Sequence, residues 1–260
     1  MIAALPDTLH SKLIPPLLDA MRPSAVIGFL HGFSAHFGLV SLPKSRGAVL
    51  LAPKGPGTAL RQRFLEGMGI PALLATADSS NAADAELLAL GWADGIGCTR
   101  AGVVRTTFAA EAETDLFGEQ AVLCGGLMGL IRAAYETLVQ AGYPPLIAYM
   151  ECAHEVKQIA DLVCDRGLDG MLSAISPTAR FGAVDAAPRI VDDALRERLK
   201  AMLTSVQDGS FAQRLASETA AGWPRTSGLR RELHASGVES AGREVRALLP
   251  WLRIPQGSSQ

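Results

Sequence analysis

AVLLA, at residues 48–52, is the middle one of three short apolar runs that decide the fold of the first half of the chain. The other two are AVIGFL at residues 25–30 and PALLATA at residues 71–77. The segments between the runs, residues 53–69 and 81–93, have apolar residues at helical spacing. Because buried strands that alternate with helices usually form parallel sheets, we expect an α/β architecture with a parallel sheet.

The second half of the chain has a different pattern. From about Phe108 onward, apolar residues recur at intervals of three and four through residues 116–138, 147–163 and 194–206. No further β-branched or alternating run follows in the sequence. We therefore expect this half to be all-helical.

The change of pattern sets the expected domain boundaries. We expect an α/β domain at residues 1–107 and a helical domain at residues 108–253. The last segment, residues 254–260, is polar and lies at the chain terminus, so we expect it to be frayed.

Composition excludes some classes of partner. Of the 260 residues, 48% are hydrophobic, and 24 basic against 26 acidic residues leave a net charge of −2. The sequence has no basic stripe interleaved with aromatic residues, so we expect no nucleic-acid partner. It also has no cationic leader and no uncharged run as long as a bilayer is thick, which favours a cytoplasmic protein without membrane contact.

Two pairs of acidic residues are embedded in apolar helical sequence. Asp115 and Glu119 are four residues apart in ETDLFGEQAVLCGG, as are Glu151 and Glu155 in YMECAHEVK. This spacing places like charges on one helix face, where each pair is destabilising by about 0.2–0.5 kcal/mol. Solvated faces paired with nearby Arg and Lys are one interpretation. We favour the other, a Mg²⁺ or Mn²⁺ site, because hard carboxylate oxygens suit these cations.

Three other patterns are weaker. His154 completes a Glu-x-x-His with Glu151, as in di-iron helical bundles, but a second such motif is missing. GPGTAL at residues 55–60 imitates a dinucleotide-binding turn without its third glycine. GFSAH at residues 32–36 resembles a nucleophile elbow without the closing glycine. Turn and packing roles are the simpler interpretation of the last two.

Four stretches together resemble the short form of ketol-acid reductoisomerase. They are HGFSAHFG at residues 31–38, LAPKGPG at 51–57, ETDLFGEQAVLCGG at 113–126 and AYMECAHEVKQIADLV at 148–163. Further similarity includes SAISPTARFG, and the match spans nearly the whole chain. The resemblance implies an enzyme of branched-chain amino-acid biosynthesis with a knotted, all-helical dimerising domain after a Rossmann-type domain.

The resemblance also implies a site with two Mg²⁺ ions. It makes Asp115 the carboxylate that both ions share and Glu119 a ligand of one ion. Glu151 and Glu155 become the outer ligands, and Glu155 also faces the substrate.

Further residues take their roles from the same resemblance. Ser176 matches the serine that contacts the substrate carboxylate, and His31 and Lys54 match residues that line the site. The expected catalytic set is therefore His31, Lys54, Glu119 and Glu155. In the family, the second carboxylate pair and the serine come from the neighbouring subunit, which implies a homodimer with a shared active site.

The chain departs from the family pattern at its N-terminus. The family starts with a segment that carries a Gly-x-Gly-x-x-Gly turn for NADPH, whereas Met1 falls where the family reaches the segment seen here as Leu5-Pro6-Asp7. The pyrophosphate depends on that turn. We therefore expect a truncated, partial Rossmann domain with no cofactor-binding residues and no NADPH. Its sheet should have an exposed edge, unless a partner or residues 1–22 cover it.

Three functions remain open on these grounds. The preferred one is a Mg²⁺-dependent enzyme that acts on an acetolactate-like α-hydroxy-β-keto acid by alkyl migration or related enolate chemistry, without NADPH reduction. The second is full ketol-acid reductoisomerase activity, with the NADPH half supplied elsewhere or missing from the sequence. The third is a non-catalytic metal-binding dimer or regulator.

Overall fold

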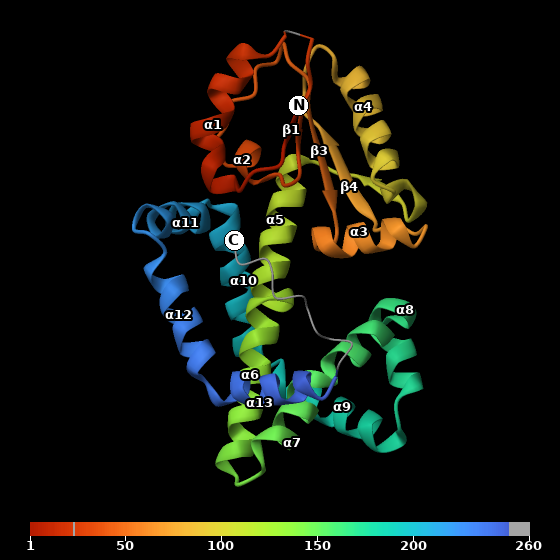
Figure 1. The fold of residues 1–260 in the computed structure, drawn as a ribbon, viewed down its shortest axis with the longest axis vertical. Coiled ribbons are helices and arrows are strands. Elements are labelled where there is room, and N and C mark those ends of the chain that lie inside the picture. The colour runs from red at the N-terminus through yellow and green to blue at the C-terminus, as the bar shows by residue number, and fades with distance from the viewer. Residues whose placement is uncertain (23, 250–260) are drawn as a thin grey trace. The chain divides into compact units, whose positions relative to one another are not determined.

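The computed structural model describes residues 1–22 and 24–249 (Figure 1). The chain forms two compact units. Unit 1 comprises Met1–Gly118 with Ser205–Ala216, and unit 2 comprises Glu119–Thr204 with Ser217–Gln260. The tail expected at residues 254–260 lies outside the described residues.

Unit 1 is built on a five-stranded sheet in the order β1-β2-β3-β4-β5. The strands are β1 (Ile2–Ala3), β2 (Ile27–Phe29), β3 (Ala48–Pro53), β4 (Ala72–Thr76) and β5 (Val103–Arg105). The three apolar runs are thus confirmed as β2, β3 and β4. The sequence does not predict β1 and β5, because neither strand lies within a longer apolar run, as β2 does.

The sheet is mixed, so the prediction of a parallel sheet is wrong for one pair of strands. β3 and β4 are antiparallel, with Pro53 opposite Ala72, and the other three pairs are parallel. The connecting helix α3 (Gly57–Leu65) has no buried residue and lies beyond the ends of these strands (Figure 1). A parallel pair would need a crossover that packs on a sheet face, and α3 does not provide one.

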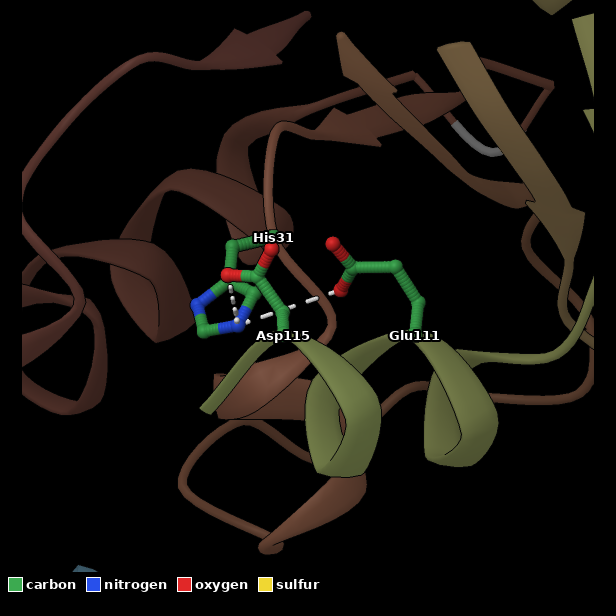
Figure 2. A group of neighbouring side chains, drawn as sticks. All are labelled: His31, Glu111 and Asp115. Atoms are coloured by element: carbon green, nitrogen blue, oxygen red, sulfur yellow. Dashed lines mark ion pairs between the residues drawn. The ribbon is translucent and has the colours of Figure 1, made fainter. Parts of the chain in front are cut away.

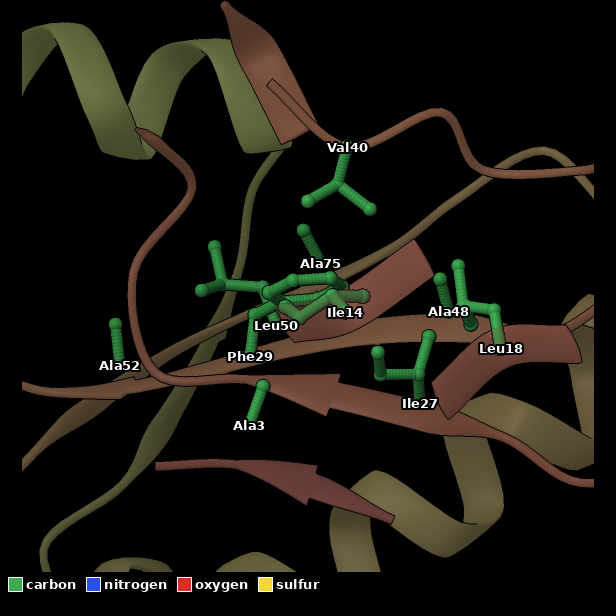
Figure 3. Close-up of a cluster of buried hydrophobic side chains, with 10 residues drawn as sticks. All are labelled: Ala3, Ile14, Leu18, Ile27, Phe29, Val40, Ala48, Leu50, Ala52 and Ala75. Carbon is green, nitrogen blue, oxygen red and sulfur yellow. The ribbon is translucent and has the colours of Figure 1, made fainter. Parts of the chain in front are cut away.

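Helices cover both faces of the sheet. On one face, Ile14 of α1 (Asp7–Ala20) packs with Phe29 and Leu50 in a fully buried cluster (Figure 3). On the other face, the alanines of α4 (Ala82–Gly95) pack against Val49 and Leu51. Neighbouring residues of β3 therefore point into two different cores, which is why its sequence is continuously apolar.

The N-terminal residues cover the edge of β2. Ile2 and Ala3 pair in parallel with Gly28 and Phe29. The Met1 amino group donates to the carbonyl oxygen of Val26 at 2.8 Å. The edge of β2, which we expected to be exposed unless a partner or residues 1–22 covered it, is therefore covered by β1 of the same chain, and α1 follows β1.

Every described element after β5 is a helix, as predicted. These elements are α5 (Phe108–Gly118), the π-helix η2 (Glu119–Leu123), α6 (Gly125–Gln140), α7 (Pro145–Tyr149), the π-helix η3 (Met150–His154), α8 (Val156–Ala174), α9 (Pro177–Ile190), α10 (Asp193–Gln207), α11 (Ser210–Ala220), α12 (Pro224–Ala235) and α13 (Gly237–Ala247). The buried core of unit 2 is small and centres on Tyr135, Ala148 and Ala241.

Unit 2 exposes much apolar surface. Its exposed apolar side chains include Val122, Leu123, Leu130, Ile147, Leu168, Phe181 and Val184. The helical run Phe108–Gln140 is long and apolar enough to cross a membrane by length and composition alone, and 6% of its most apolar window is buried. Monomeric soluble proteins rarely leave apolar patches of this extent uncovered.

Two glycines follow the first π turn because no side chain fits there. The turn is closed by the amide of Cys124, which donates to the carbonyl oxygen of Glu119 at 2.9 Å. A Cβ on Gly125 would lie 2.4 Å from the carbonyl oxygen of Gln120. A Cβ on Gly126 would lie 2.1 Å from the carbonyl oxygen of Ala121. The two glycines are therefore required by the π turn.

Replacing Gly126 by alanine should lower the free energy of unfolding by about 1–3 kcal/mol, because the backbone must shift to relieve the overlap. The control is Gly91→Ala in α4, where a Cβ meets no atom within 4 Å. That variant should gain about 0.5–1 kcal/mol from the better helix propensity of alanine. Urea unfolding followed by circular dichroism measures both, and equal effects of the two substitutions would contradict the role of Gly126.

Candidate active site

Two polar side chains lie at the carboxyl edge of the sheet. His31 follows β2 and Lys54 follows β3 directly. Since β2 and β3 are parallel, their carboxyl ends meet at the same edge, which is where ligands bind in open α/β sheets.

Helix α5 places two carboxylates against this edge. Glu111 and Asp115 are four residues apart and share one helix face. Lys54 Nζ donates to Glu111 Oε1 at 2.8 Å and to Asp115 Oδ1 at 2.9 Å. The Gly32 amide donates to Glu111 Oε2 at 2.7 Å, and a Cβ on Gly32 would lie 2.3 Å from the carbonyl oxygen of Phe108. The turn after His31 therefore packs directly on α5.

The His31 ring lies close to the carboxylates of Asp115 and Glu111 (Figure 2). Its Nδ1 is 3.2 Å from Asp7 Oδ2, and its Nε2 is 3.5 Å from Asp115 Oδ2 and 3.9 Å from Glu111 Oε2. Burial acts to lower the pKa of His31, but the hydrogen bond to Asp7 and the charges of Glu111, Asp7 and Asp115 outweigh it and raise that pKa above its ordinary value. The acidic surroundings thus stabilise a positive charge at this position.

Lys54 shows the same balance. Burial acts to lower its pKa, and the hydrogen bonds and charges of Asp115 and Glu111 raise that pKa instead. Lys54 therefore remains charged and offsets the negative charge of the two carboxylates.

The geometry fits a bound cation. His31, Glu111 and Asp115 each offer a ligand atom, and these atoms lie within 4.8 Å of one another. Among the described residues, His31 Nε2 is a buried polar atom without a hydrogen-bond partner. The two carboxylates of this group offer the oxygen ligands that Mg²⁺ prefers, whereas the imidazole nitrogen of His31 does not select for this ion.

The other expected residues lie in unit 2. Glu119 begins η2, Glu151 lies in η3, and Glu155 follows η3. All three are exposed within the single chain, so the burial that their apolar sequence suggested is not found there. Ser176 caps α9, and its Oγ accepts from the Ala179 amide at 3.2 Å. The structure therefore gathers His31, Lys54 and Asp115 in unit 1, and the complete ligand set stays a prediction.

Sequence reasoning missed Glu111, although it is 1% exposed and contacts both Lys54 and Gly32. A signal was present, because Glu111 precedes Asp115 by the same four residues that separate Asp115 from Glu119.

The structure also excludes a nucleophile elbow in GFSAH at residues 32–36. Ser34 in GFSAH is fully buried, so it does not serve as an exposed nucleophile.

Replacing Glu111 by alanine should lower the free energy of unfolding by about 1–3 kcal/mol, because the buried Gly32 amide loses its acceptor. The control is Glu113→Ala on the same helix, whose side chain is 25% exposed and pairs with His36. Among the described contacts, Glu113 accepts no hydrogen bond from a buried backbone amide, so we expect a smaller loss from this variant. Urea unfolding measures the free energy of unfolding of both variants. An equal decrease in the two variants would contradict the specific role of Glu111 as acceptor for the Gly32 amide.

Two family profiles match the chain. Residues 1–102 match the NADPH-binding domain of acetohydroxy acid isomeroreductase. Residues 108–251 match the C-terminal domain of ketol-acid reductoisomerase.

Individual relatives agree with these profiles. The ketol-acid reductoisomerase (NADP(+)) of Petrotoga mobilis is 45% identical over 252 residues, which cover 95% of this chain and 75% of the relative. That of Helicobacter pylori (strain HPAG1) is 43% identical over 248 residues, with the same two shares. The solved structure of an NADH-preferring ketol-acid reductoisomerase from an uncultured archean has a TM-score of 0.90 and 36% identity, and covers 96% of this chain and 76% of its own.

These matches correct the expectations about the first domain. The NADPH-binding domain is present as a Rossmann-like α/β domain before the helical domain, so the prediction of a chain that lacks this segment is wrong. The prediction that NADPH does not bind is wrong for the same reason. The matches also support full reductoisomerase activity over the non-reductive enzyme that we preferred. The chain belongs to the ketol-acid reductoisomerase family, whose members are oxidoreductases and isomerases of branched-chain amino-acid synthesis.

Proposed function

We propose that the protein catalyses the full ketol-acid reductoisomerase reaction with Mg²⁺ and NADPH. Its substrate is an acetolactate-like 2-hydroxy-2-alkyl-3-keto acid, which undergoes an alkyl shift and is then reduced to a dihydroxy acid. The observation that carries the proposal is the cluster of His31, Lys54, Glu111 and Asp115 at the carboxyl edge of β2 and β3, in a chain that matches both domains of the family.

The metal-binding residues are Asp115 and Glu119 from the α5–η2 segment, with Glu151 and Glu155 as the second pair. When bound, two Mg²⁺ ions would polarise the hydroxyl and carbonyl oxygens of the substrate. The two π turns support this assignment, since Glu119 lies in one and Glu151 in the other, and π turns inside helices occur frequently at functional sites.

The chain's own side chains orient this chemistry. Lys54 holds Glu111 and Asp115 in fixed positions through two short hydrogen bonds. His31 presents Nε2 to the same carboxylates and can take up or release a proton there. Glu155 faces the substrate and serves, with Glu119, as an acid or base for the hydroxyl proton.

Ser176 binds the substrate carboxylate. Its Oγ accepts from the Ala179 amide at the start of α9, and this leaves the hydroxyl proton available as a donor. The helix cap thus fixes the oxygen while the proton points to a ligand.

NADPH binds at the carboxyl edge of β1, β2 and β3. When bound, it supplies the hydride for the second stage of the reaction. Leu5 and Leu30 lie near the carboxyl ends of β1 and β2, and each is 41% exposed. Apolar surface beside the polar cluster suits a flat nicotinamide ring.

We also propose that the NADPH-binding domain ends at residue 107 and that the helical domain spans residues 108–253.

The functional form is a homodimer with shared, knotted helical domains. Glu151, Glu155 and Ser176 of one subunit complete the site of the other. Two features support this arrangement: these three residues are exposed in the single chain, and unit 2 has an extensive exposed apolar surface that a second copy would bury.

Purified protein with Mg²⁺, 2-acetolactate and NADPH should oxidise NADPH and form the dihydroxy acid, detected by absorbance and mass spectrometry. Chelation of Mg²⁺ should abolish turnover. Asp115→Asn should lower kcat by at least about 100-fold. Loss of a group that only orients a metal ligand typically lowers activity about 10- to 100-fold, and loss of the ligand itself should lower it more. The control, Asp19→Asn, changes an exposed carboxylate of α1 and should leave kcat unchanged. NADH should be tested in parallel, and turnover without any nicotinamide cofactor would contradict the proposal.

Mixed dimers test the shared site. Asp115→Asn and Glu151→Gln should each inactivate a homodimer. When the two variants are coexpressed at equal amounts, about half of the dimers contain one subunit of each kind. If the site is shared, such a mixed dimer has both substitutions in one active site, and its other active site is intact. The sample should therefore recover about a quarter of the wild-type activity. Sites formed within one chain would restore none. Analytical ultracentrifugation should show a dimer in both cases.

A further inference from the structure

Asp7 contacts His31 from the start of α1. An acidic residue in the first helical turn is ordinarily explained by the helix dipole. Here both carboxylate oxygens are also used by other elements. Oδ2 is 3.2 Å from His31 Nδ1, and Oδ1 is 3.3 Å from Ser34 Oγ and 3.4 Å from His10 Nδ1.

A buried layer lies behind Asp7. His10 is 3% exposed and Ser34 is fully buried. His10 Nε2 donates to the carbonyl oxygen of Leu5 at 3.0 Å, and His10 Nδ1 is 2.8 Å from Ser34 Oγ. The Ser34 hydroxyl donates to Asp7 Oδ1, and the same hydroxyl oxygen contacts His10 Nδ1, so Ser34 lies between the ring and the carboxylate. The His10 ring also packs edge-on against Phe29, with ring centroids 5.9 Å apart.

This layer fixes one tautomer of His31. An ionised carboxylate only accepts hydrogen bonds, so the contact with Asp7 requires a proton on His31 Nδ1. Nε2 is then the atom left to face Asp115 and Glu111, and it is the buried atom without a hydrogen-bond partner among the described residues. The ring plane is held by Phe33, stacked at 6.0 Å with an interplanar angle of 18°.

We propose that Asp7, held in place by Ser34 and His10, is a positioning residue that fixes the orientation and tautomer of His31, so that Nε2 points to the carboxylates and the substrate. The inference rests on the proposed function, because it assigns a role within that same site. It also explains why Ser34 follows His31 by three residues on the turn after β2: the serine belongs to the layer that holds Asp7.

The variant Asp7→Asn tests the inference, because an amide of the same shape can donate to Nδ1 and stabilise the opposite tautomer. We expect kcat to fall about 10- to 100-fold with KM changed less than about threefold, as for groups that orient a ligand without touching the substrate. Ser34→Ala, which removes one support of Asp7, should show a smaller fall. Asp7→Glu, which keeps the acceptor, should recover part of the activity, and Asp19→Asn on the same helix is the control.

Nitrogen NMR of the histidine rings gives a readout without metal or turnover. In the wild-type protein at alkaline pH, the neutral His31 ring should carry its proton on Nδ1, and in Asp7→Asn the proton should move to Nε2. An unchanged tautomer, or a raised KM with unchanged kcat, would overturn the inference. If the wild-type protein shows no reductoisomerase activity but the tautomer changes as expected, the proposed function fails and the positioning role stands. Circular dichroism of each variant separates these results from unfolding.

Discussion

The ion-paired contact of Lys54 with Glu111 and Asp115 is the interaction on which the site depends. Glu111 is 1% exposed, and an ionised carboxylate at such a position is costly unless it is paired and hydrogen-bonded. Lys54 and the Gly32 amide supply both requirements. Because they follow β3 and β2, the contact fixes α5 against the carboxyl edge of the sheet. Every other feature of the site is positioned relative to this attachment.

The order of the strands explains why these groups meet. β1, β2 and β3 run in parallel, so the segments that follow them, with Asp7, His31 and Lys54, emerge on the same side. The antiparallel strand β4 follows α3, which lies beyond the carboxyl end of β3 and contributes the partly buried Leu60 to the core shared with α4. Lys54 lies in the short segment that joins β3 to α3, so this connection carries one of the charged groups of the site.

The two units differ in how completely they bury their apolar residues. Unit 1 has cores on both faces of its sheet, whereas unit 2 buries few side chains and leaves its helices apolar on the outside. Its carboxylates and Ser176 are exposed as well. The homodimer proposed above would cover this surface. The glycines after the first π turn fix the helix geometry beside Glu119.

By itself, the sequence determined the local elements and the chemistry of the residues. It predicted β2, β3 and β4 from apolar runs and the helical half from helical spacing, and its resemblance to the family named Asp115, His31 and Lys54, which the structure places together. The prediction that NADPH does not bind was wrong, because it relied on one glycine turn, whereas residues 1–102 as a whole match the NADPH-binding domain. Only the tertiary structure decided the antiparallel pairing of β3 and β4 and the contacts of Glu111 and Asp7. Lys54 and Glu111 are 57 residues apart in the chain, and such a contact has no local signature: it exists only once strand ends and helix α5 have packed together.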